Sequence, residues 1–354
     1  MFQPGLKGVT AVETKLSHID GQRGVLTYRG IPVQELVNSY TFEEVAYFLL
    51  YERFPTQTEI TAFETALKKS RYLPAYKLTI LEQLPDEMEL MDVLRTIVSA
   101  SLPNEDDTKT AIQLIAIIPI IIAYRYRKQT KMPIIEPNSA LNHVENFLYM
   151  INEDHNSTHA KILETYMILT MEHSLNASTF AARVTISTKS DLIAAITSAL
   201  GAMKGPLHGG APSGVIELLE EIKTEDTISE IIHKKLENKE RIMGFGHRVY
   251  KTTDPRAEAL KMTIMKLDNL PDWMSLAIKT EQETIKILKE NKPNYQLYTN
   301  VEYYAAAIMK TLELDPKLFT PIFSASRIVG WCAHAIEQTN NNTIFRPTAM
   351  YVGK

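Results

Sequence analysis

Helix-start signals recur along almost the whole sequence, and this repetition restricts the chain to a mainly helical fold. Three pairs have the spacing of a capping box and open an amphipathic run: Thr41 with Glu44, Thr56 with Glu59, and Thr227 with Glu230. After Asp191 the apolar residues again fall on one helical face. Strand-like segments are short and few, at 24–28 and 298–303. Because strands and helices do not alternate, we expect an all-α fold and no parallel α/β sheet.

The most apolar segment, residues 111–124, predicts a buried helix. It has 14 residues and contains Gln113 and Pro119, whereas a membrane span needs about 20 apolar residues. We expect a core helix that is kinked at Pro119. The first 15 residues have neither the apolar run of a signal peptide nor the Arg/Ser-rich composition of a transit peptide. The sequence therefore indicates a cytoplasmic protein without membrane contact.

Composition excludes several classes of protein. A net charge of −4 at pH 7 argues against a nucleic-acid binder, because such proteins usually carry a basic excess. The single cysteine, Cys332, excludes an internal disulfide and fits a reducing compartment. We expect Cys332 to be a small buried apolar residue beside Trp331. A length of 354 residues suits one large domain or two unequal ones.

Most of the nine histidines have no chemistry around them in the sequence. His155 and His159 have a spacing that could suit a metal pair, but they lie in a polar segment without a matching cluster. We therefore predict a solvated loop there and no metal site. Four others are assigned packing or surface roles: His18, His143, His233 and His334.

Two histidine segments are different. His208 stands in GPLHGGA, just before a predicted helix whose first turn includes Pro212. Small residues let a ligand approach the backbone, and a helix start supplies free N–H donors. His247 stands in GFGHRVYK, followed by DPR at 254–256, which places an imidazole among cations and predicts an anionic substrate. No strand precedes this Gly-x-Gly and no third glycine follows, so a dinucleotide-binding turn is excluded. By its local sequence, His173 fits a core residue as well as a functional one.

These two segments resemble the citrate synthase family, and further matches follow the family's order over nearly the whole chain. They are GLKGV…ID…GVLTYRG at the start, ENFLYM from Glu145, EHSLNAST from Glu172, NVEYYAA from Asn300, and SASRIVGWCAH, FRP and YVG near the end. The resemblance implies a citrate synthase-like helical homodimer in which a smaller domain closes over an interdomain cleft. Carried onto this chain, the large domain comprises 1–209 and 312–354 and the small domain comprises 210–311.

The resemblance also implies a reaction, the condensation of acetyl-CoA with oxaloacetate and water to citrate and CoA. The family's catalytic histidines fall on His208 and His247, and its catalytic aspartate falls on Glu302. Glu302 would remove a methyl proton while His208, as a neutral donor, stabilises the enol. His247 would protonate the oxaloacetate carbonyl. Glutamate reaches about 1.5 Å further than aspartate, and a misplacement of about 1 Å can cost about 100-fold in rate, so we expect a working but altered base.

Substrate-binding residues follow from the same resemblance. Those expected at oxaloacetate are His173, Asn176, Arg256, Arg327 and Arg346, the last contributed by the neighbouring subunit. Those expected at CoA are Ile242, Met243, Gly244, Phe245, Gly246 and Lys251. For Arg248, a surface charge and a CoA contact are equally good interpretations. The reaction implies no cofactor beyond acetyl-CoA as a substrate, and no metal.

Three alternatives stay open at this level. Acetyl-CoA and propionyl-CoA differ by one methylene, worth about 1–3 kcal/mol in a pocket, so a 2-methylcitrate synthase or a dual-specificity enzyme is the first alternative. A weakly active regulator that binds CoA or oxaloacetate is the second. A nucleic-acid binder that uses 247–256 as a basic patch is the third, and the net charge argues against it. The chain lacks the extra N-terminal segment of the long, NADH-inhibited members, so we expect a simple dimer without that control.

Overall fold

The computed structural model describes residues 2–209, 213–267, 272–292 and 297–353. About 62% of the structure is helical, which confirms the all-α prediction. The helices of the first part are α1 (Val33–Ser39), α2 (Phe42–Tyr51), α3 (Gln57–Lys69), α4 (Ala75–Gln83), α5 (Leu90–Ser99), α6 (Asp107–Gln129), α7 (His143–Asn152), α8 (Ser157–Thr170), α9 (Ala177–Ser187) and α10 (Leu192–Met203). They are followed by α11 (Ser213–Ile222), α12 (Ile228–Glu237), α13 (Pro255–Ile264), α14 (Asp272–Asn291), α15 (Val301–Thr311) and α16 (Phe319–Asn340).

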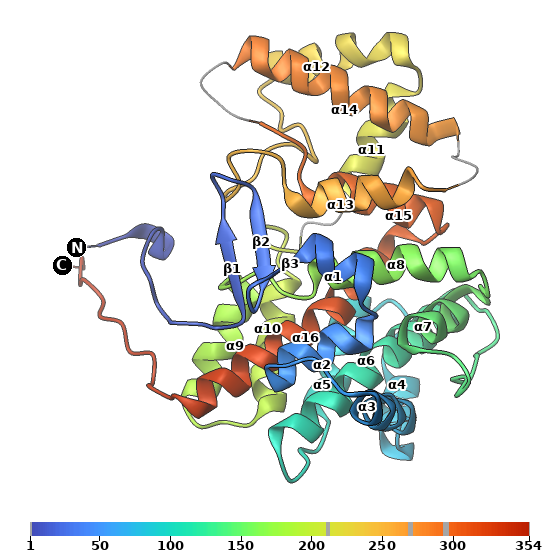
Figure 1. Cartoon of the computed structure of the whole chain (residues 1–354), viewed down its shortest axis with the longest axis vertical. Helices are drawn as coiled ribbons and strands as arrows, with labels where there is room; N and C mark the ends of the chain where they lie inside the picture. Colours follow the sequence, from blue (N-terminus) through green and yellow to red (C-terminus); the bar gives the residue numbers. More distant parts are fainter. Residues whose placement is uncertain (1, 210–212, 268–271, 293–296, 354) are drawn as a thin grey trace.

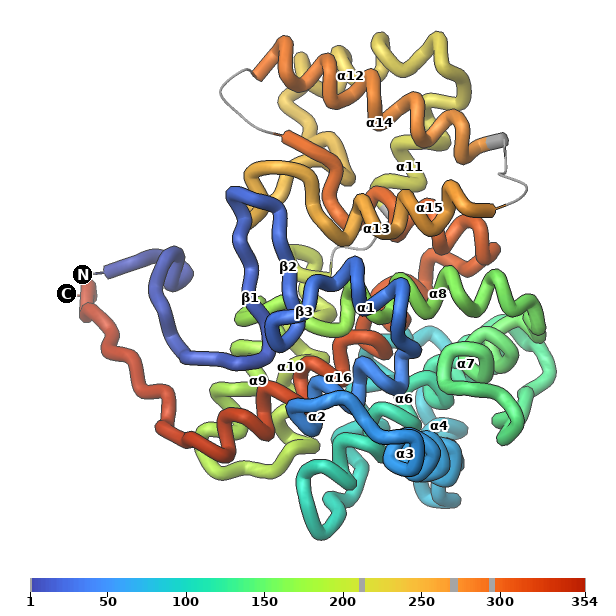
Figure 2. The backbone as a smooth tube through the Cα atoms, viewed as in Figure 1, coloured from blue at the N-terminus to red at the C-terminus, as the bar shows by residue number. Residues whose placement is uncertain are grey.

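The helices form two groups, which Figures 1 and 2 show one above the other. The smaller group consists of α11–α15, and the main body consists of α1–α10 with α16. α16 runs through the main body and contacts α2, α5, α6, α8, α9 and α10. The two groups meet where α13 contacts α1 and α8, and where α15 contacts α8. The chain therefore leaves the main body after α10 and returns to it with α16.

The capping signals predicted all three helix starts, and two of the three form complete capping boxes. Thr41 and Thr56 form complete capping boxes with Glu44 and Glu59 at the starts of α2 and α3. The capping box at Thr227 is wrong, because a 3₁₀ turn (Glu225–Thr227) runs directly into α12. Thr227 is already in a helical conformation, and its hydroxyl donates back to the carbonyl of Thr224 (2.9 Å). Its side chain accepts no hydrogen bond from the first turn of α12.

The apolar segment 111–124 lies within α6, whose central residues are buried against the core. By length and composition alone, α6 is the one helix among the described residues that could cross a membrane, and 67% of its most apolar window is buried inside the protein. This burial is what the core helix of a globular protein shows, and it confirms the predicted buried helix. Pro119 lies inside α6. Cys332 is also fully buried, as predicted.

A short three-stranded antiparallel sheet comes before the helices. It is formed by β1 (Ser17–Asp20), β2 (Val25–Tyr28) and β3 (Ile31–Pro32), in that order. β2 confirms the strand predicted at 24–28. The strand predicted at 298–303 is wrong, because Asn300 caps α15 and turns the residues from Val301 onward into a helix. There Val, Tyr and Ala pack on the buried face of a helix instead of a strand, and tertiary packing overrides their β-propensity.

The hairpin between β1 and β2 reaches the smaller helical group (Figure 2). At its tip the carbonyl of Gly21 accepts a hydrogen bond from the backbone N–H of Lys251 (2.8 Å). A Cβ atom on Gly21 would lie 2.4 Å from the carbonyl oxygen of Val249, so only glycine allows this approach. The hairpin thus fixes the segment that follows His247.

The two ends of the chain extend away from the helical body (Figure 1). In the C-terminal tail, residues 341–353, Tyr351 is 82% exposed and Val352 is 87% exposed. In the N-terminal arm, Phe2 is 72% exposed. These apolar side chains on the extended arms are largely exposed to solvent.

His155 and His159, the two histidines predicted to lie in a solvated loop, differ from that prediction in one respect. His159 lies in the first turn of α8, not in a loop, and its Nδ1 lies 2.6 Å from Asp154 Oδ2. Asn156, the N-cap of α8, fixes this geometry by accepting from the N–H groups of Thr158 and His159. The expected start of a helix at Pro212 and the domain boundary at Gly210 lie outside the described residues.

Candidate active site

His208 stands between α10 and α11 and faces the N-terminus of α9. Its Nε2 accepts a hydrogen bond from the backbone N–H of Ser178 (3.3 Å) and lies 2.7 Å from the Ser178 hydroxyl. That hydroxyl also accepts from the indole Nε1 of Trp331 (3.0 Å). Since a backbone N–H can only donate, Nε2 must be unprotonated and the ring proton must sit on Nδ1.

Several features keep His208 neutral. Burial, with a further contribution from the positive charge of Arg327, lowers the pKa of the imidazole to about 4. The N-terminal end of α9 also disfavours a cation. Nδ1 makes no hydrogen bond to any residue that the structure describes, so its proton is free to be donated to a ligand.

His247 is held by the opposite ring nitrogen. Its Nδ1 accepts from the backbone N–H groups of Val249 (3.0 Å) and Tyr250 (3.1 Å). The proton therefore sits on Nε2, which lies 3.5 Å from Nη2 of Arg256. Burial, with a further contribution from the Arg256 charge, lowers the pKa of His247 to about 4. Near neutral pH the ring is thus a neutral donor beside a guanidinium.

Arg256 is buried at the start of α13 and paired with Asp254. Its Nε and Nη2 donate to the two carboxylate oxygens at 3.0 and 2.7 Å. Asp254 is also the N-cap of α13, and its Oδ2 accepts from the N–H of Val301 at 3.1 Å. The Asp254 charge raises the pKa of Arg256 despite the opposing effect of burial. The guanidinium is thus fixed in place, with Nη1 making no hydrogen bond in the described part of the chain.

Arg327 comes from α16 in the main body. Its Nε donates to the carbonyl of Thr170 (2.6 Å), and its guanidinium lies over the ring of Phe323 (4.8 Å). Burial lowers its pKa to about 10, so it remains charged at neutral pH. Neither Nη atom donates to a residue among those described. Two buried guanidinium groups with free N–H donors suit a substrate with two carboxylates.

His173 joins these groups through Tyr250, which the sequence analysis did not identify. The Nε2 atom of His173 lies 3.1 Å from the Tyr250 hydroxyl, and its ring meets that of His247 edge-on at 5.7 Å. Tyr250 is 1% exposed, and its ring also lies 5.7 Å from the Arg256 guanidinium. Burial lowers the pKa of His173 well below its usual value. His173, His247, Tyr250 and Arg256 thus form one cluster.

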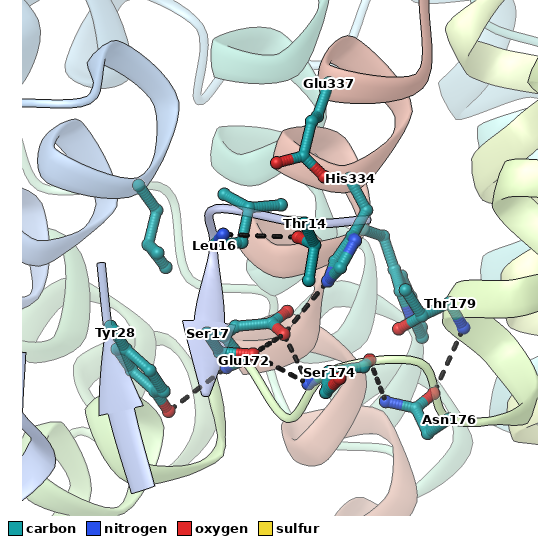
Figure 3. Close-up of polar contacts among 12 residues, drawn as sticks. Thr14, Leu16, Ser17, Tyr28, Glu172, Ser174, Asn176, Thr179, His334 and Glu337 are labelled. Atoms are coloured by element: carbon teal, nitrogen blue, oxygen red, sulfur yellow. Dashed lines mark hydrogen bonds and ion pairs between the residues drawn. The ribbon is translucent and has the colours of Figure 1, made fainter. Parts of the chain in front are cut away.

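The buried carboxylate of Glu172, the residue before His173, lies between Ser17, Ser174 and His334 (Figure 3). Glu172 Oε1 lies 2.9 Å from Nε2 of His334 and accepts from the Ser17 hydroxyl (2.8 Å) and the Ser174 N–H (2.5 Å). Full burial raises the pKa of Glu172, but the interactions with His334 and Arg327 and the Ser17 hydrogen bond outweigh burial and lower it. Ser174 has a φ of +51°, a strained conformation for a non-glycine residue. His334, assigned a packing or surface role from the sequence, is therefore part of this support.

Asn176 serves the site through the helix that it caps. Its Oδ1 accepts from the Thr179 N–H (3.1 Å) and lies 2.8 Å from the Ser178 hydroxyl. Asn176 thus orients the serine that contacts His208. The structure therefore brings Asn176 to the surroundings of His208 as well as to the His173 loop.

Glu302 lies half-buried in the first turn of α15. Its carboxylate makes no hydrogen bond to a described residue, while its N–H donates to Oδ1 of Asn300 (3.0 Å). Burial raises the pKa of Glu302, and the charges of Arg241 and Arg256 counter part of that rise. An uncommitted carboxylate with a raised pKa is the kind of group that accepts a proton from a weak carbon acid.

A pocket of about 300 Å³ opens beside His247. Its lining comprises Glu240, Arg241, Ile242, Phe245, Gly246, His247, Arg248, Leu288, Lys292 and Leu297. Ile242, Phe245 and Gly246 are three of the six residues expected at CoA. Gly244 and Gly246 both have a φ of +83°, so the turn needs glycine at both positions. The apolar floor and the cationic rim suit a ligand that combines a flat base with phosphates.

Three of the expected residues do not line this pocket. Met243 and Gly244 face the helices of the smaller group, with Gly244 packed against Tyr303. The ammonium group of Lys251 donates to the carbonyl of Arg248 (3.3 Å) at the surface. Arg346 lies on the extended C-terminal tail, where its Nη1 donates to the carbonyl of Pro347 (3.3 Å). One chain therefore does not bring Arg346 to the histidine cluster.

The residues that the sequence analysis missed act through distant partners. Ser178 lies 30 positions from His208, and Glu172 lies 162 positions from His334. No periodicity reports such contacts. A local signal existed only for Tyr250, which stands three residues after His247 and is large enough to pack on the ring.

Comparison with known proteins gives one consistent result. The family model described as "Citrate synthase, C-terminal domain" matches residues 5–348. A crystal structure of citrate synthase from Thermotoga maritima is 43% identical, with a TM-score of 0.90, and the match covers 100% of this chain and 96% of that one. The 2-methylcitrate synthase of Shewanella oneidensis is 38% identical over 99% of this chain and 94% of its own length.

A third comparison concerns ligands. The citrate synthase from Thermoplasma acidophilum, whose structure is a ternary complex with carboxymethyl coenzyme A and oxaloacetate, is 32% identical to this chain, with a TM-score of 0.91. The match covers 100% of this chain and 97% of that one. The likeness thus extends over the whole of both chains and includes the segments that carry the two histidines.

Proposed function

The chain belongs to the citrate synthase family of acyltransferases, and we propose that it uses acetyl-CoA as acyl donor, with His208, His247 and Glu302 dividing the chemistry. The single observation that carries this proposal is the state of the two histidines. Both are neutral, and each has one ring nitrogen held by backbone N–H groups and the other left as a donor. Condensation of a thioester enol with a ketone needs two such donors, one at each carbonyl oxygen.

The reaction begins at the thioester. The Glu302 carboxylate takes a proton from the methyl carbon, and the electron pair of the broken C–H bond forms the enol. His208 donates from Nδ1 to the thioester oxygen, which stabilises the charge that develops there. Because burial raises the pKa of Glu302, its basicity is better matched to this weak acid than that of an exposed carboxylate.

The second step joins the two substrates. The enol carbon attacks the carbonyl carbon of oxaloacetate, and the carbonyl oxygen takes the proton from Nε2 of His247. Arg256 and Arg327 bind the two carboxylates, with His173 beside them. Water then attacks the carbonyl carbon of the citryl thioester and returns a proton to Nε2 of His247, and the C–S bond breaks as the CoA sulfur takes the proton that Glu302 removed from the methyl group. Because water is excluded until that point, the thioester of acetyl-CoA is not hydrolysed before condensation.

The domain division gives a physical route to this exclusion. We place the large domain at 1–209 and 312–354 and the small domain at 210–311, so that His208 and His173 lie on one side and His247 and Glu302 on the other. The contacts of α13 and α15 with the main body support this division. The pocket beside His247 supports the placement of CoA, with Ile242, Phe245 and Gly246 at its base.

A homodimer completes the site in this proposal. The exposed apolar C-terminal tail and the exposed Arg346 support an arm that reaches a second copy and brings its guanidinium to oxaloacetate. We also place the protein in the cytoplasm. A solution mass near 40.1 kDa, that of a monomer, would contradict the dimer.

The acyl group has one serious alternative. The 2-methylcitrate synthase of Shewanella oneidensis is 38% identical to this chain, so propionyl-CoA, alone or beside acetyl-CoA, is the second candidate substrate. One methylene in a pocket is worth about 1–3 kcal/mol. The ratio of kcat/KM for the two thioesters decides between the candidates.

The test is thiol release from acetyl-CoA and from propionyl-CoA, each with and without oxaloacetate. We expect oxaloacetate-dependent release from acetyl-CoA, and a loss of turnover of at least about 100-fold in Glu302→Ala. Glu290→Ala, an exposed acid on α14, is the matched control and should retain parental activity. Parental turnover in Glu302→Ala would refute its role as base. Binding of both substrates without any thiol release would instead favour a weakly active regulator.

A further inference from the structure

Asn300 lies where the two proposed catalytic segments of the smaller helical group meet. Its Oδ1 accepts from the backbone N–H of Glu302 (3.0 Å), and its Nδ2 donates to the carbonyl of Gly246 (2.9 Å). Its own backbone N–H donates to the carbonyl of Gly244 (2.9 Å). The residue is only 4% exposed. One side chain therefore joins the residue before His247 to the first turn of the helix that carries Glu302.

The neighbouring contacts hold these segments but do not set the position of Glu302. Gly246 donates to the carbonyl of Tyr298 (2.7 Å), and Phe245 pairs with Thr299 in an isolated bridge. The Thr299 hydroxyl donates to the buried Glu281 (2.7 Å). All of these bonds end before α15 begins. The amide of Asn300 links the carbonyl of Gly246 to the N–H of Glu302 itself, whereas the bond from the N–H of Val301 to Asp254 (3.1 Å) ends one residue before Glu302.

The residue type fits this double task. Serine, threonine and aspartate cap helices about as well as asparagine. Serine and threonine are too short to reach the Gly246 carbonyl as well, and aspartate has no N–H to donate. Asparagine does both, because its amide has an acceptor at one atom and donors at the other.

We propose that Asn300 is a positioning residue for the condensation, which sets the separation between the Glu302 carboxylate and the His247 imidazole. This inference rests on the proposed function. The base and the carbonyl donor must act on two substrates that lie against each other, so their separation decides whether the reacting carbons align. A shift of about 1 Å between such groups can cost about 100-fold in rate.

The test uses Asn300→Ser and Asn300→Asp, both of which keep a helix cap and lose the bond to Gly246. We expect kcat to fall at least about tenfold, with the KM of each substrate changed by less than about threefold. The matched control is Asn142→Ser, because Asn142 is also an asparagine N-cap and its Oδ1 accepts from the backbone N–H of Glu145 (2.8 Å) at the start of α7. The control should keep the parental kcat and KM.

A second measurement separates positioning from a general loss of structure. In the Glu302→Gln background the position of the side chain no longer matters, so adding Asn300→Ser should lower the residual kcat by less than about twofold. A structural role would lower the residual kcat by the same factor as in the parent. That outcome, or a parental kcat in both single variants, would overturn the inference.

The outcomes also distinguish this inference from the proposed function. If the parent releases no thiol, the proposed function fails first. If the parent is active and Asn300→Ser and Asn300→Asp match it, only the role of Asn300 fails. Thermal unfolding of each variant is measured in parallel, and failure of both single variants to fold would overturn the inference by making Asn300 a residue required for folding.

Discussion

The segments around His208 and His247 reach the same chemical state by opposite geometry. At His208 a helix N-terminus donates to Nε2, and Nδ1 carries the proton. At His247 two successive N–H groups of a loop donate to Nδ1, and Nε2 carries the proton. Burial lowers the pKa of both rings to about 4. Backbone donors decide which nitrogen is free, and the residue type alone does not.

The largest predicted effect comes from replacing His208 or His247 with asparagine or glutamine. The amide nitrogen of asparagine lies close to the position of Nδ1, and that of glutamine lies close to the position of Nε2. We expect His208→Asn and His247→Gln to keep about tenfold more activity than His208→Gln and His247→Asn, and the mismatched pair to lose on the order of 100-fold or more in kcat. The kcat values of the four variants check this prediction. Equal losses within each pair, or the reverse order, would show that the free nitrogen is assigned wrongly.

A smaller effect is expected from Ser178, because its side chain contacts the ring of His208 and not that of His247. Ser178→Ala removes the hydroxyl at His208 and leaves the buried Trp331 indole without its acceptor. We expect kcat to fall about tenfold, because the ring can move by a fraction of an ångström. Steady-state kinetics of Ser178→Ala beside Ser229→Ala, an exposed serine on α12, measure this loss. Unchanged kcat would mean that the backbone N–H of Ser178 holds the ring by itself.

Local patterns predicted the parts of the fold that depend on neighbouring residues. Capping at Thr41 and Thr56 and the buried face of α10 are confirmed, because each depends on residues within one turn or one helix. The error at 298–303 arose because apolar and aromatic residues read as a strand when the cap at Asn300 is not recognised. The 3₁₀ turn that ends at Thr227 could not be predicted from the spacing of Thr227 and Glu230.

The site was predictable only in part. The resemblance pointed to His173, His208, His247 and Glu302, and the structure places these side chains around the junction of the two helical groups. The tautomers were not predictable, because they depend on Ser178, Val249 and Tyr250 donating from positions that only the fold defines. The support of His173 by Glu172 and His334 likewise needs two distant helices to pack.

The smallest predicted effect concerns the base that works beside His247. Arg241 is the first of the charges that counter the rise in the pKa of Glu302. Removing it in Arg241→Gln should raise that pKa slightly, since the arginine is exposed and screened. The base must be ionised, so the acid limb of the pH profile of kcat should move to higher pH. The shift should shrink in 1 M salt, where the Debye length is about 3 Å, and a shift to lower pH would contradict the assignment.

The contacts that Glu172 makes next to His173 also determine when the site can form during synthesis. Glu172 needs Ser17 from the start of the chain and His334 from its last helix. The backbone N–H of Lys15 donates to Glu337 across 322 positions (2.8 Å). A growing chain therefore holds the His173 loop without its imidazole partner until α16 has left the ribosome. Because closing such long loops is slow compared with forming helices, oxaloacetate has no complete site until nearly the whole chain is present.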